Sequence, residues 1–185
     1  MKENDKRWIE NFRVRRSIQD ALLALMKRKH VSKISISDII GEAGVARASY
    51  YRNYDSVRDV VQDYLKRMDE EIDRAMNPGD VSDIAAVKKN LMVLLSYYKA
   101  HREEIMLLFE NGFAELLQEN TDQFIINAFG DMPAKSIERY NLYFLSGAIS
   151  RVQLEWLKNN CYDSIEDFAE LNIKFFQNNL SLFQV

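Results

Sequence analysis

The stretch from Ser35 to Tyr54 constrains the fold of this chain more than any other part of the sequence. Ser35 and Asp38 flank its start in the pattern of a capping box, with Asp in place of Glu. Gly44 stands where a helix must end, because glycine adopts positive φ without a Cβ penalty. Between these signals, apolar residues have the spacing of one helix face: Ile36, Ile39, Ile40 and Ala43. The pattern predicts a helix of two turns followed by a tight turn.

A second short helix is predicted from about Arg47 to Tyr54, and only Tyr50 and Tyr54 are expected to point inward. In a helix-turn-helix unit, such a second helix lies in the major groove of DNA. Arg47 could then donate two hydrogen bonds to a guanine, and Ala48 could contact a thymine methyl group. The polar residues suited to bases or phosphates are Ser49, Tyr51 and Asn53. Periodicity alone leaves open an ordinary helical hairpin with a solvated polar face.

The motif is more specific than its periodicity, and it resembles the TetR family of bacterial transcriptional regulators. The shared features are Ser35, the apolar helix, Ala43-Gly44-Val45, and a short helix that ends in Tyr51-x-x-Tyr54. Upstream, Arg15 and the run from Ile18 to Met26 resemble the first helix of the family. The resemblance covers about a third of the chain, up to Leu65.

This resemblance implies an all-α protein with two parts. Residues 1–55 would form a three-helix, helix-turn-helix DNA-binding head, and residues 56–185 a helical-bundle body for ligand binding and dimerisation. The implied DNA-binding residues are Arg15, Ser35, Arg47, Ala48, Ser49, Tyr51, Asn53 and Arg58. Several positions depart from the family pattern: Ala46 opens the second helix without a small polar residue, Val57 replaces a lysine associated with a phosphate contact, and Ala48 and His30 stand where glycine is common.

Composition supports a helical protein with a basic head. The chain has two prolines and six glycines in 185 residues, and periodic apolar patterns fill nearly its whole length. Residues 1–64 contain 13 Lys/Arg and 9 Asp/Glu, a net charge of +4, whereas the whole chain carries −3. A basic segment on an acidic chain is what a DNA-binding head would show, although a charge of +4 is also within ordinary scatter.

In the body, helices are predicted over residues 84–100, 103–118, 122–129, 134–159 and 165–182, with turn signals at 77–80 and 130–133. By resemblance, the last two helices would form a four-helix bundle with a second copy, through Tyr140, Phe144, Gly147, Ala148, Arg151, Phe168 and Phe175. An effector cavity would be lined by Tyr97, Phe109, Phe113, Tyr143 and Trp156. The alternative for both sets is that these side chains fill the core of one chain.

The sequence contains no catalytic, nucleotide-binding or metal-ligand motif, so we expect neither an enzyme nor a cofactor or metal. The single Cys161 and the absence of a signal-like or membrane-spanning segment lead us to expect a cytoplasmic protein with no membrane partner. The expected function is that of a ligand-responsive transcriptional regulator, by family habit a repressor. It would bind a pseudo-palindromic double-stranded DNA operator as a homodimer, and a small-molecule effector would release it. The alternative is a TetR-like protein-interaction module or co-regulator that has lost strong DNA binding.

Overall fold

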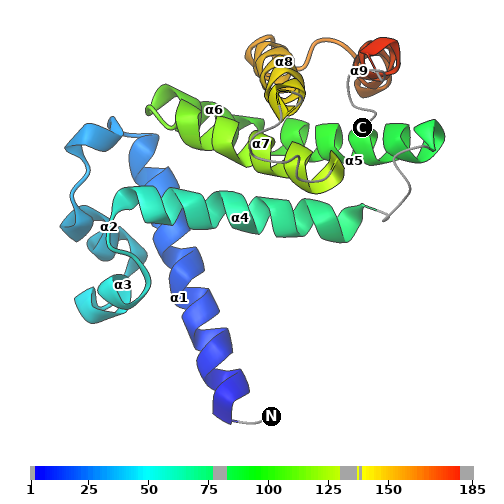
Figure 1. Ribbon diagram of the computed structural model, residues 1–185. Coiled ribbons are helices and arrows are strands. Elements are labelled where there is room, and N and C mark those ends of the chain that lie inside the picture. The colour runs from blue at the N-terminus through cyan, green and yellow to red at the C-terminus, as the bar shows by residue number, and fades with distance from the viewer. Residues whose placement is uncertain (1–2, 77–82, 130–136, 138, 180–185) are drawn as a thin grey trace. The chain divides into compact units, whose positions relative to one another are not determined.

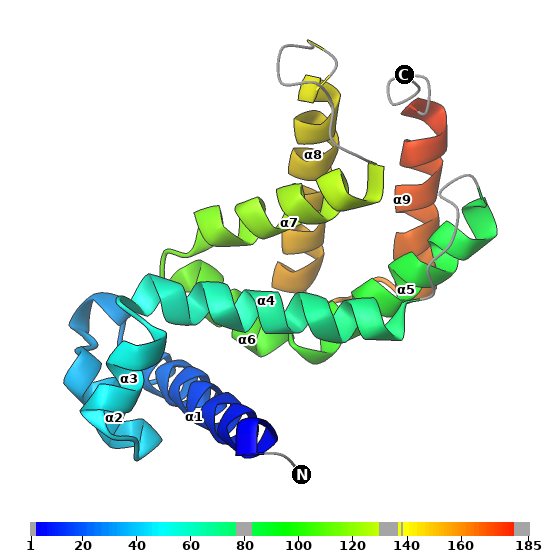
Figure 2. The ribbon, with the colours of Figure 1, turned by 60° about the horizontal axis from the view of Figure 1, so that its bottom comes forward.

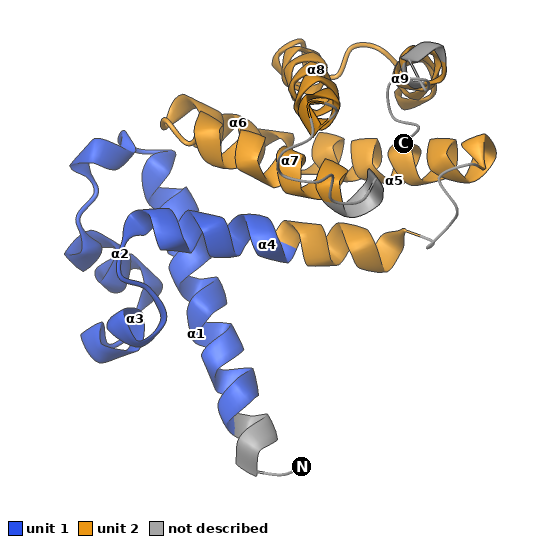
Figure 3. Cartoon of the chain, in the orientation of Figure 1, with its two compact units in different colours: residues 1–67 blue, residues 68–185 orange. Residues whose placement is uncertain are grey.

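The computed structural model describes residues 3–76, 83–129, 137 and 139–179. Within these ranges the chain forms nine α-helices, one short 3₁₀-helix and no strand, which confirms the predicted all-α fold (Figure 1). The chain divides into two compact units, residues 1–67 and residues 68–185 (Figure 3). The division falls inside helix α4 (Val57–Ala75), and a functional boundary at residue 55 stays a prediction.

The first unit consists of α1 (Glu3–Met26), the 3₁₀-helix η1 (Val31–Lys33), α2 (Ile36–Ala43), α3 (Arg47–Asn53) and the first part of α4. Helices α1, α2 and α3 pack on one another. The centre of the unit is formed by side chains with almost no exposure to solvent: Ile18, Leu22, Ile39, Tyr50, Val60 and Val61. Burial of such side chains is the main force that holds these helices together.

Local hydrogen bonds fix both ends of α2, and the predicted capping box is confirmed. The Ser35 hydroxyl accepts a hydrogen bond from the Asp38 amide at 3.1 Å, and the Ser35 amide donates to the Asp38 carboxylate at 2.8 Å. The bond from the Ser35 backbone and an ion pair with Lys29 lower the pKa of Asp38 to about 2. At the other end Gly44 has φ of 64°, the left-handed conformation that glycine adopts readily.

The second unit contains the rest of α4 and five further helices: α5 (Ile84–Ala100), α6 (Arg102–Glu110), α7 (Ala114–Phe129), α8 (Arg139–Lys158) and α9 (Ile165–Asn179). The predicted turns at 77–80 and 130–133 lie outside the described residues. The prediction of separate helices over 103–118 and 122–129 is wrong, because the break lies at Gly112, which has φ of 88°. Thr121 does not interrupt α7, since its hydroxyl donates to the Leu117 carbonyl one turn earlier.

Helices α8 and α9 run alongside each other in the second unit (Figures 1 and 2). Trp156 of α8 stacks on Phe168 of α9, with ring centroids 4.9 Å apart and planes inclined by 8°. Nearer the start of α8, Leu142 and Leu145 pack with Ile125 of α7. No helix in the described ranges combines the length and hydropathy that crossing a membrane requires.

Candidate nucleic-acid interface

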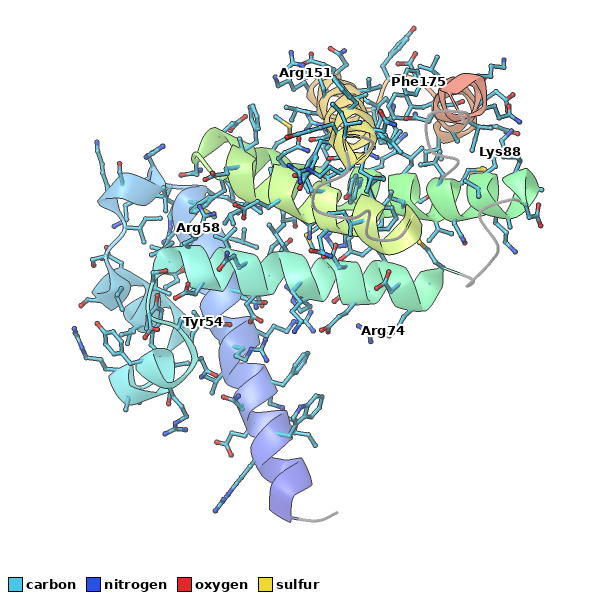
Figure 4. The ribbon with its side chains drawn as sticks, viewed as in Figure 1. Tyr54, Arg58, Arg74, Lys88, Arg151 and Phe175 are labelled. Carbon is cyan, nitrogen blue, oxygen red and sulfur yellow. The ribbon has the colours of Figure 1, made fainter. Side chains whose placement is uncertain are left out.

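Helix α3 presents a polar face to solvent because two tyrosines fix its other face. Tyr50 and Tyr54 are 0% and 4% exposed, and their spacing of four residues places them on one side of the helix. Tyr54 lies between α3 and the start of α4 (Figure 4). The exposed residues are Arg47, Ala48, Tyr51 and Arg52. The two predicted inward residues therefore match the observed burial, whereas Ser49 and Asn53 of the predicted outward set are half-buried.

Arg47 is the centre of a small polar cluster on this exposed face. Its guanidinium donates to the Tyr51 hydroxyl at 3.3 Å and lies 5.5 Å from the centre of the Tyr51 ring. It also donates to the hydroxyl of Ser37, in the first turn of α2, at 3.4 Å. These bonds are long and exposed, so the same donors can be redirected to a ligand at low cost. Ser37 was not predicted as a site residue, because only the fold brings it beside Arg47.

Two other predicted contact residues, Ser35 and Asn53, already use their side-chain polar groups in hydrogen bonds within the protein. The Ser35 hydroxyl belongs to the capping box of α2. The Asn53 side-chain amide donates to the Ser49 carbonyl at 2.8 Å, and both residues are half-buried. Their roles toward DNA stay predictions. Of the predicted DNA-binding residues on α3, three have exposed side chains: Arg47, Ala48 and Tyr51.

Arg15 was predicted to contact DNA, but in this structure Asp63 of α4 binds its guanidinium. Arg15 Nε donates to Asp63 Oδ2 at 2.9 Å, and a second guanidinium nitrogen pairs with Oδ1. Gln19 Nε2 and the Tyr54 hydroxyl donate to the same Oδ2 at 2.7 and 2.5 Å. The cluster joins α1, the end of α3 and α4. The cluster therefore orients α3, and it engages the Arg15 guanidinium in an ion pair within the protein.

The pKa values of the cluster follow from these contacts. Burial on its own would raise the pKa of Asp63, but the hydrogen bonds from Arg15 and Tyr54 outweigh it and hold the pKa below its usual value. Burial and the bond to Asp63 raise the pKa of Tyr54. At neutral pH the cluster is thus an arginine–carboxylate pair with a neutral phenol donor.

Helix α4 begins beside α3 with a capping arrangement of its own. The Asp59 carboxylate accepts from the backbone amides of Asp55 and Ser56 at 2.9 and 2.8 Å, and the Asp59 amide donates to the Ser56 hydroxyl. Val57 is the first residue of the helix, and the predicted contact residue Arg58 is exposed in its first turn (Figure 4). Ala46, at the start of α3, provides no side-chain cap, as its residue type predicted.

The side chains proposed to line an effector cavity have varied environments. Trp156 is 3% exposed and stacked on Phe168, whereas Tyr143 is exposed. The Tyr97 hydroxyl donates to Glu71 at 2.7 Å, and Lys158 lies 4.9 Å from the centre of the Phe109 ring. Phe113 is half-buried. Trp156 thus packs within the core of the second unit, and a cavity lined by this set stays a prediction.

The residues proposed for a dimer interface also differ in exposure. On α8, the exposed members are Tyr140, Phe144 and Arg151, while Gly147 and Ala148 are half-buried. On α9, Phe175 is exposed (Figure 4). Phe168 differs from the prediction, because its ring is buried against Trp156 of the same chain. Val152 and Leu171 are exposed apolar residues that the prediction did not include.

Comparisons with known proteins agree with this architecture. No family model matches the sequence. An uncharacterized HTH-type transcriptional regulator of Bacillus subtilis (strain 168), YxbF, is 24% identical over 99 residues, which cover 51% of this chain and 26% of that protein. The chain thus spans about a quarter of the length of this curated relative.

Two solved structures are similar over almost the whole chain. A TetR transcriptional regulator from Streptococcus agalactiae 2603V has a TM-score of 0.59 and 16% identity, covering 94% of this chain and 98% of that one. The dihydroxyacetone kinase operon activator DhaS has a TM-score of 0.58 and 15% identity, covering 93% and 98%. The chain therefore has the all-helical fold of a TetR-type regulator, and the resemblance seen in the sequence is confirmed at the level of the fold.

Proposed function

We propose that this protein is a transcriptional regulator that reads duplex DNA with helix α3. The observation that carries the proposal is the exposed face of α3, where Arg47, Tyr51 and Arg52 stand in solvent while Tyr50 and Tyr54 anchor the helix from behind. A helix held in this way fits the major groove, where an arginine can donate two hydrogen bonds to a guanine. The names of the structural neighbours and of the curated relative, all regulators, support this function.

The proposed active form is a homodimer. Helices α8 and α9 carry exposed apolar or aromatic side chains: Tyr140, Phe144, Val152, Leu171 and Phe175. Large exposed apolar surfaces of this kind mark protein contacts. A two-fold dimer would present two copies of α3 to half-sites about 34–36 Å apart, so its operator would be a pseudo-palindrome.

We further propose that a small molecule bound by the second unit controls DNA binding. Such a ligand acts only through its different affinity for the DNA-binding and the released conformation. We propose repression as the outcome, following the habit of the family. The neighbour DhaS is named an operon activator. A reporter assay would therefore have to distinguish repression from activation.

The proposal is tested by selecting bound duplexes from a pool of random DNA with the full chain. We expect enrichment of one pseudo-palindromic sequence, because α3 can read base edges only at matched half-sites. Recovery of no enriched sequence, at low as well as at physiological salt, would contradict the proposal. That result would favour the alternative, an interaction module that keeps the fold without strong DNA binding.

A further inference from the structure

A half-buried carboxylate in the second unit has neutral and negative neighbours. Asp69 lies in the C-terminal half of α4, and its Oδ2 accepts a hydrogen bond from the neutral side-chain amide of Asn120, on α7, at 2.5 Å. The charges that act on Asp69 are those of Glu70 and Asp73, and no lysine or arginine among the residues that the structure describes pairs with it. Because buried charges in proteins are normally paired, Asp69 is an anchor for a cation from outside the chain.

The surroundings of Asp69 oppose its negative charge. Burial is the main reason that the pKa of Asp69 is raised to about 6, and the charges of Asp73 and Glu70 raise this pKa further. The hydrogen bond from Asn120 lowers the pKa but does not outweigh burial. A bound cation would balance a charge that the protein itself leaves poorly compensated, so the carboxylate should attract a cation more strongly than an exposed one would.

A phenol group from a third helix lies beside this carboxylate. Tyr98 belongs to α5, and it is half-buried. Burial raises the pKa of the Tyr98 hydroxyl, and so does the negative charge of Asp69, which shows that the two groups are close. The hydroxyl forms no hydrogen bond with any residue in the described ranges. Helices α4, α5 and α7 thus bring a carboxylate, a phenol and an amide together in the second unit (Figure 3).

Apolar side chains accompany the three polar groups on the helices that carry them. Each polar residue has a buried apolar residue within one turn of its own helix: Met68 and Ile72 on α4, Leu94 on α5, and Leu116 on α7. A molecule bound at Asp69 would therefore meet polar atoms at one end and apolar side chains around the rest. A few polar groups set among apolar side chains are the usual composition of a small-molecule site.

We propose that Asp69, Tyr98 and Asn120 bind the ammonium group of a small organic amine whose remaining part is apolar. A primary ammonium group has three N–H donors. The site offers three acceptor atoms: the second carboxylate oxygen of Asp69, the side-chain carbonyl oxygen of Asn120 and the hydroxyl oxygen of Tyr98. The bond to the carboxylate is charge-assisted and is the strongest of the three. The inference rests on the proposed function, in which a small molecule bound by the second unit controls DNA binding, and it names the chemical class of that molecule.

The test is a calorimetric titration of the full chain, without DNA, with propylamine, hexylamine and 2-phenylethylamine. Each amine is compared with the alcohol of the same carbon skeleton. At pH 8 we expect at least one amine to bind about tenfold more tightly than its alcohol, because only the ammonium group pairs with a carboxylate. Asp69→Asn keeps the shape of the side chain and loses its charge, so it should abolish this difference. The control Glu110→Gln removes an exposed carboxylate of the same unit and should bind like the wild type.

The pH dependence of amine binding reports on Asp69 itself. With a pKa of about 6, about a tenth of the Asp69 carboxyl groups are ionised at pH 5, whereas nearly all are ionised at pH 8. The amines stay protonated at both values, and the raised pKa of Tyr98 keeps its hydroxyl neutral. Affinity should therefore be about tenfold lower at pH 5 than at pH 8. Circular dichroism should show that Asp69→Asn keeps its helix content, because the variant removes a poorly compensated charge.

Three results would overturn the inference. The first is that no amine binds more tightly than its alcohol, and the second is that Asp69→Asn binds the amines as the wild type does. The third is equal affinity at pH 5 and pH 8. Each of these results leaves DNA reading by α3 intact. A wild type that binds an amine through Asp69 but binds no duplex would instead contradict the proposed function and leave the amine site standing.

Discussion

At the residue scale, two tyrosines one helical turn apart hold helix α3 in chemically different ways. The Tyr54 hydroxyl donates to the Asp63 carboxylate at 2.5 Å. The Tyr50 hydroxyl is buried and meets no hydrogen-bond partner in the described part of the chain, while burial raises the pKa of Tyr50 to about 12. The same substitution at the two positions should therefore have different consequences.

Tyr54→Phe should lower the free energy of unfolding by about 1.5–3 kcal/mol, because it removes a buried hydrogen bond to a charged group. Tyr50→Phe is the matched control. It removes a buried polar group that lacks a partner, so stability should stay the same or rise. Urea unfolding followed by circular dichroism measures both effects. Equal losses for the two variants would show that Asp63 does not hold Tyr54 as described.

The sequence predicted both tyrosines as anchors of the helix, but it did not predict what Tyr54 binds. Inward direction follows from helical spacing, which is local information. Asp63 is paired with Arg15 from 48 residues away, and only the packing of α1 against α4 creates this contact. For the same reason the motif predicts Arg15 at DNA and gives no sign of its pairing with Asp63.

At the element scale, the turn between α2 and α3 depends on one backbone conformation. Gly44 has φ of 64° and ends α2, and a Cβ added there would meet no atom within 4 Å. The cost of any other residue is therefore conformational and not steric. Gly41 has equally open surroundings but lies within α2 itself, where a side chain favours the helical conformation.

Gly44→Ala should destabilise the protein by about 1–2 kcal/mol, the cost of a left-handed conformation for a residue with a Cβ. Gly41→Ala should stabilise it by about 0.5–1 kcal/mol, because glycine is a poor helix residue. Thermal unfolding of the two variants checks the opposite signs. A gain at both positions would mean that the turn does not need the left-handed conformation.

Sequence reasoning found the elements of the first unit more accurately than those of the second. Ser35, Asp38 and Gly44 are strong local signals, and the structure uses each one as predicted. The break at Gly112 was missed because the flanking run of apolar residues continued the helical pattern on both sides. Where the apolar periodicity continues on both sides of a glycine, the sequence alone does not show whether that glycine adopts the positive φ that ends a helix.

At the scale of the whole molecule, the proposed dimer requires that the exposed faces of α8 and α9 meet a second copy. Phe144 is 76% exposed and lies between Tyr140 and Val152 along α8. Phe144→Asp should convert a dimer into a monomer in sedimentation velocity, because a charge would be buried without a partner. Tyr162→Asp is the matched control, since Tyr162 is 89% exposed and follows the end of α8.

We expect the control to remain dimeric at concentrations where Phe144→Asp is monomeric. A wild-type protein that sediments as a monomer at all concentrations would contradict the proposed assembly. The sequence indicated which helices would carry this surface. It placed Phe168 on the surface as well, because a face of a helix cannot be divided into core and interface without knowing that Trp156 covers that ring.

The most direct test of the central claim, that α3 reads DNA, is an anisotropy titration of Arg47→Ala on the selected duplex and on one with a changed half-site. Wild-type affinity should fall steeply with salt. Arg47→Ala should lose about 1–3 kcal/mol of binding and discriminate poorly at one base pair. Tyr51→Phe should weaken binding to both duplexes more evenly, and Lys66→Ala, an exposed cation of α4, should change little. Wild-type affinity and discrimination in Arg47→Ala would contradict the claim.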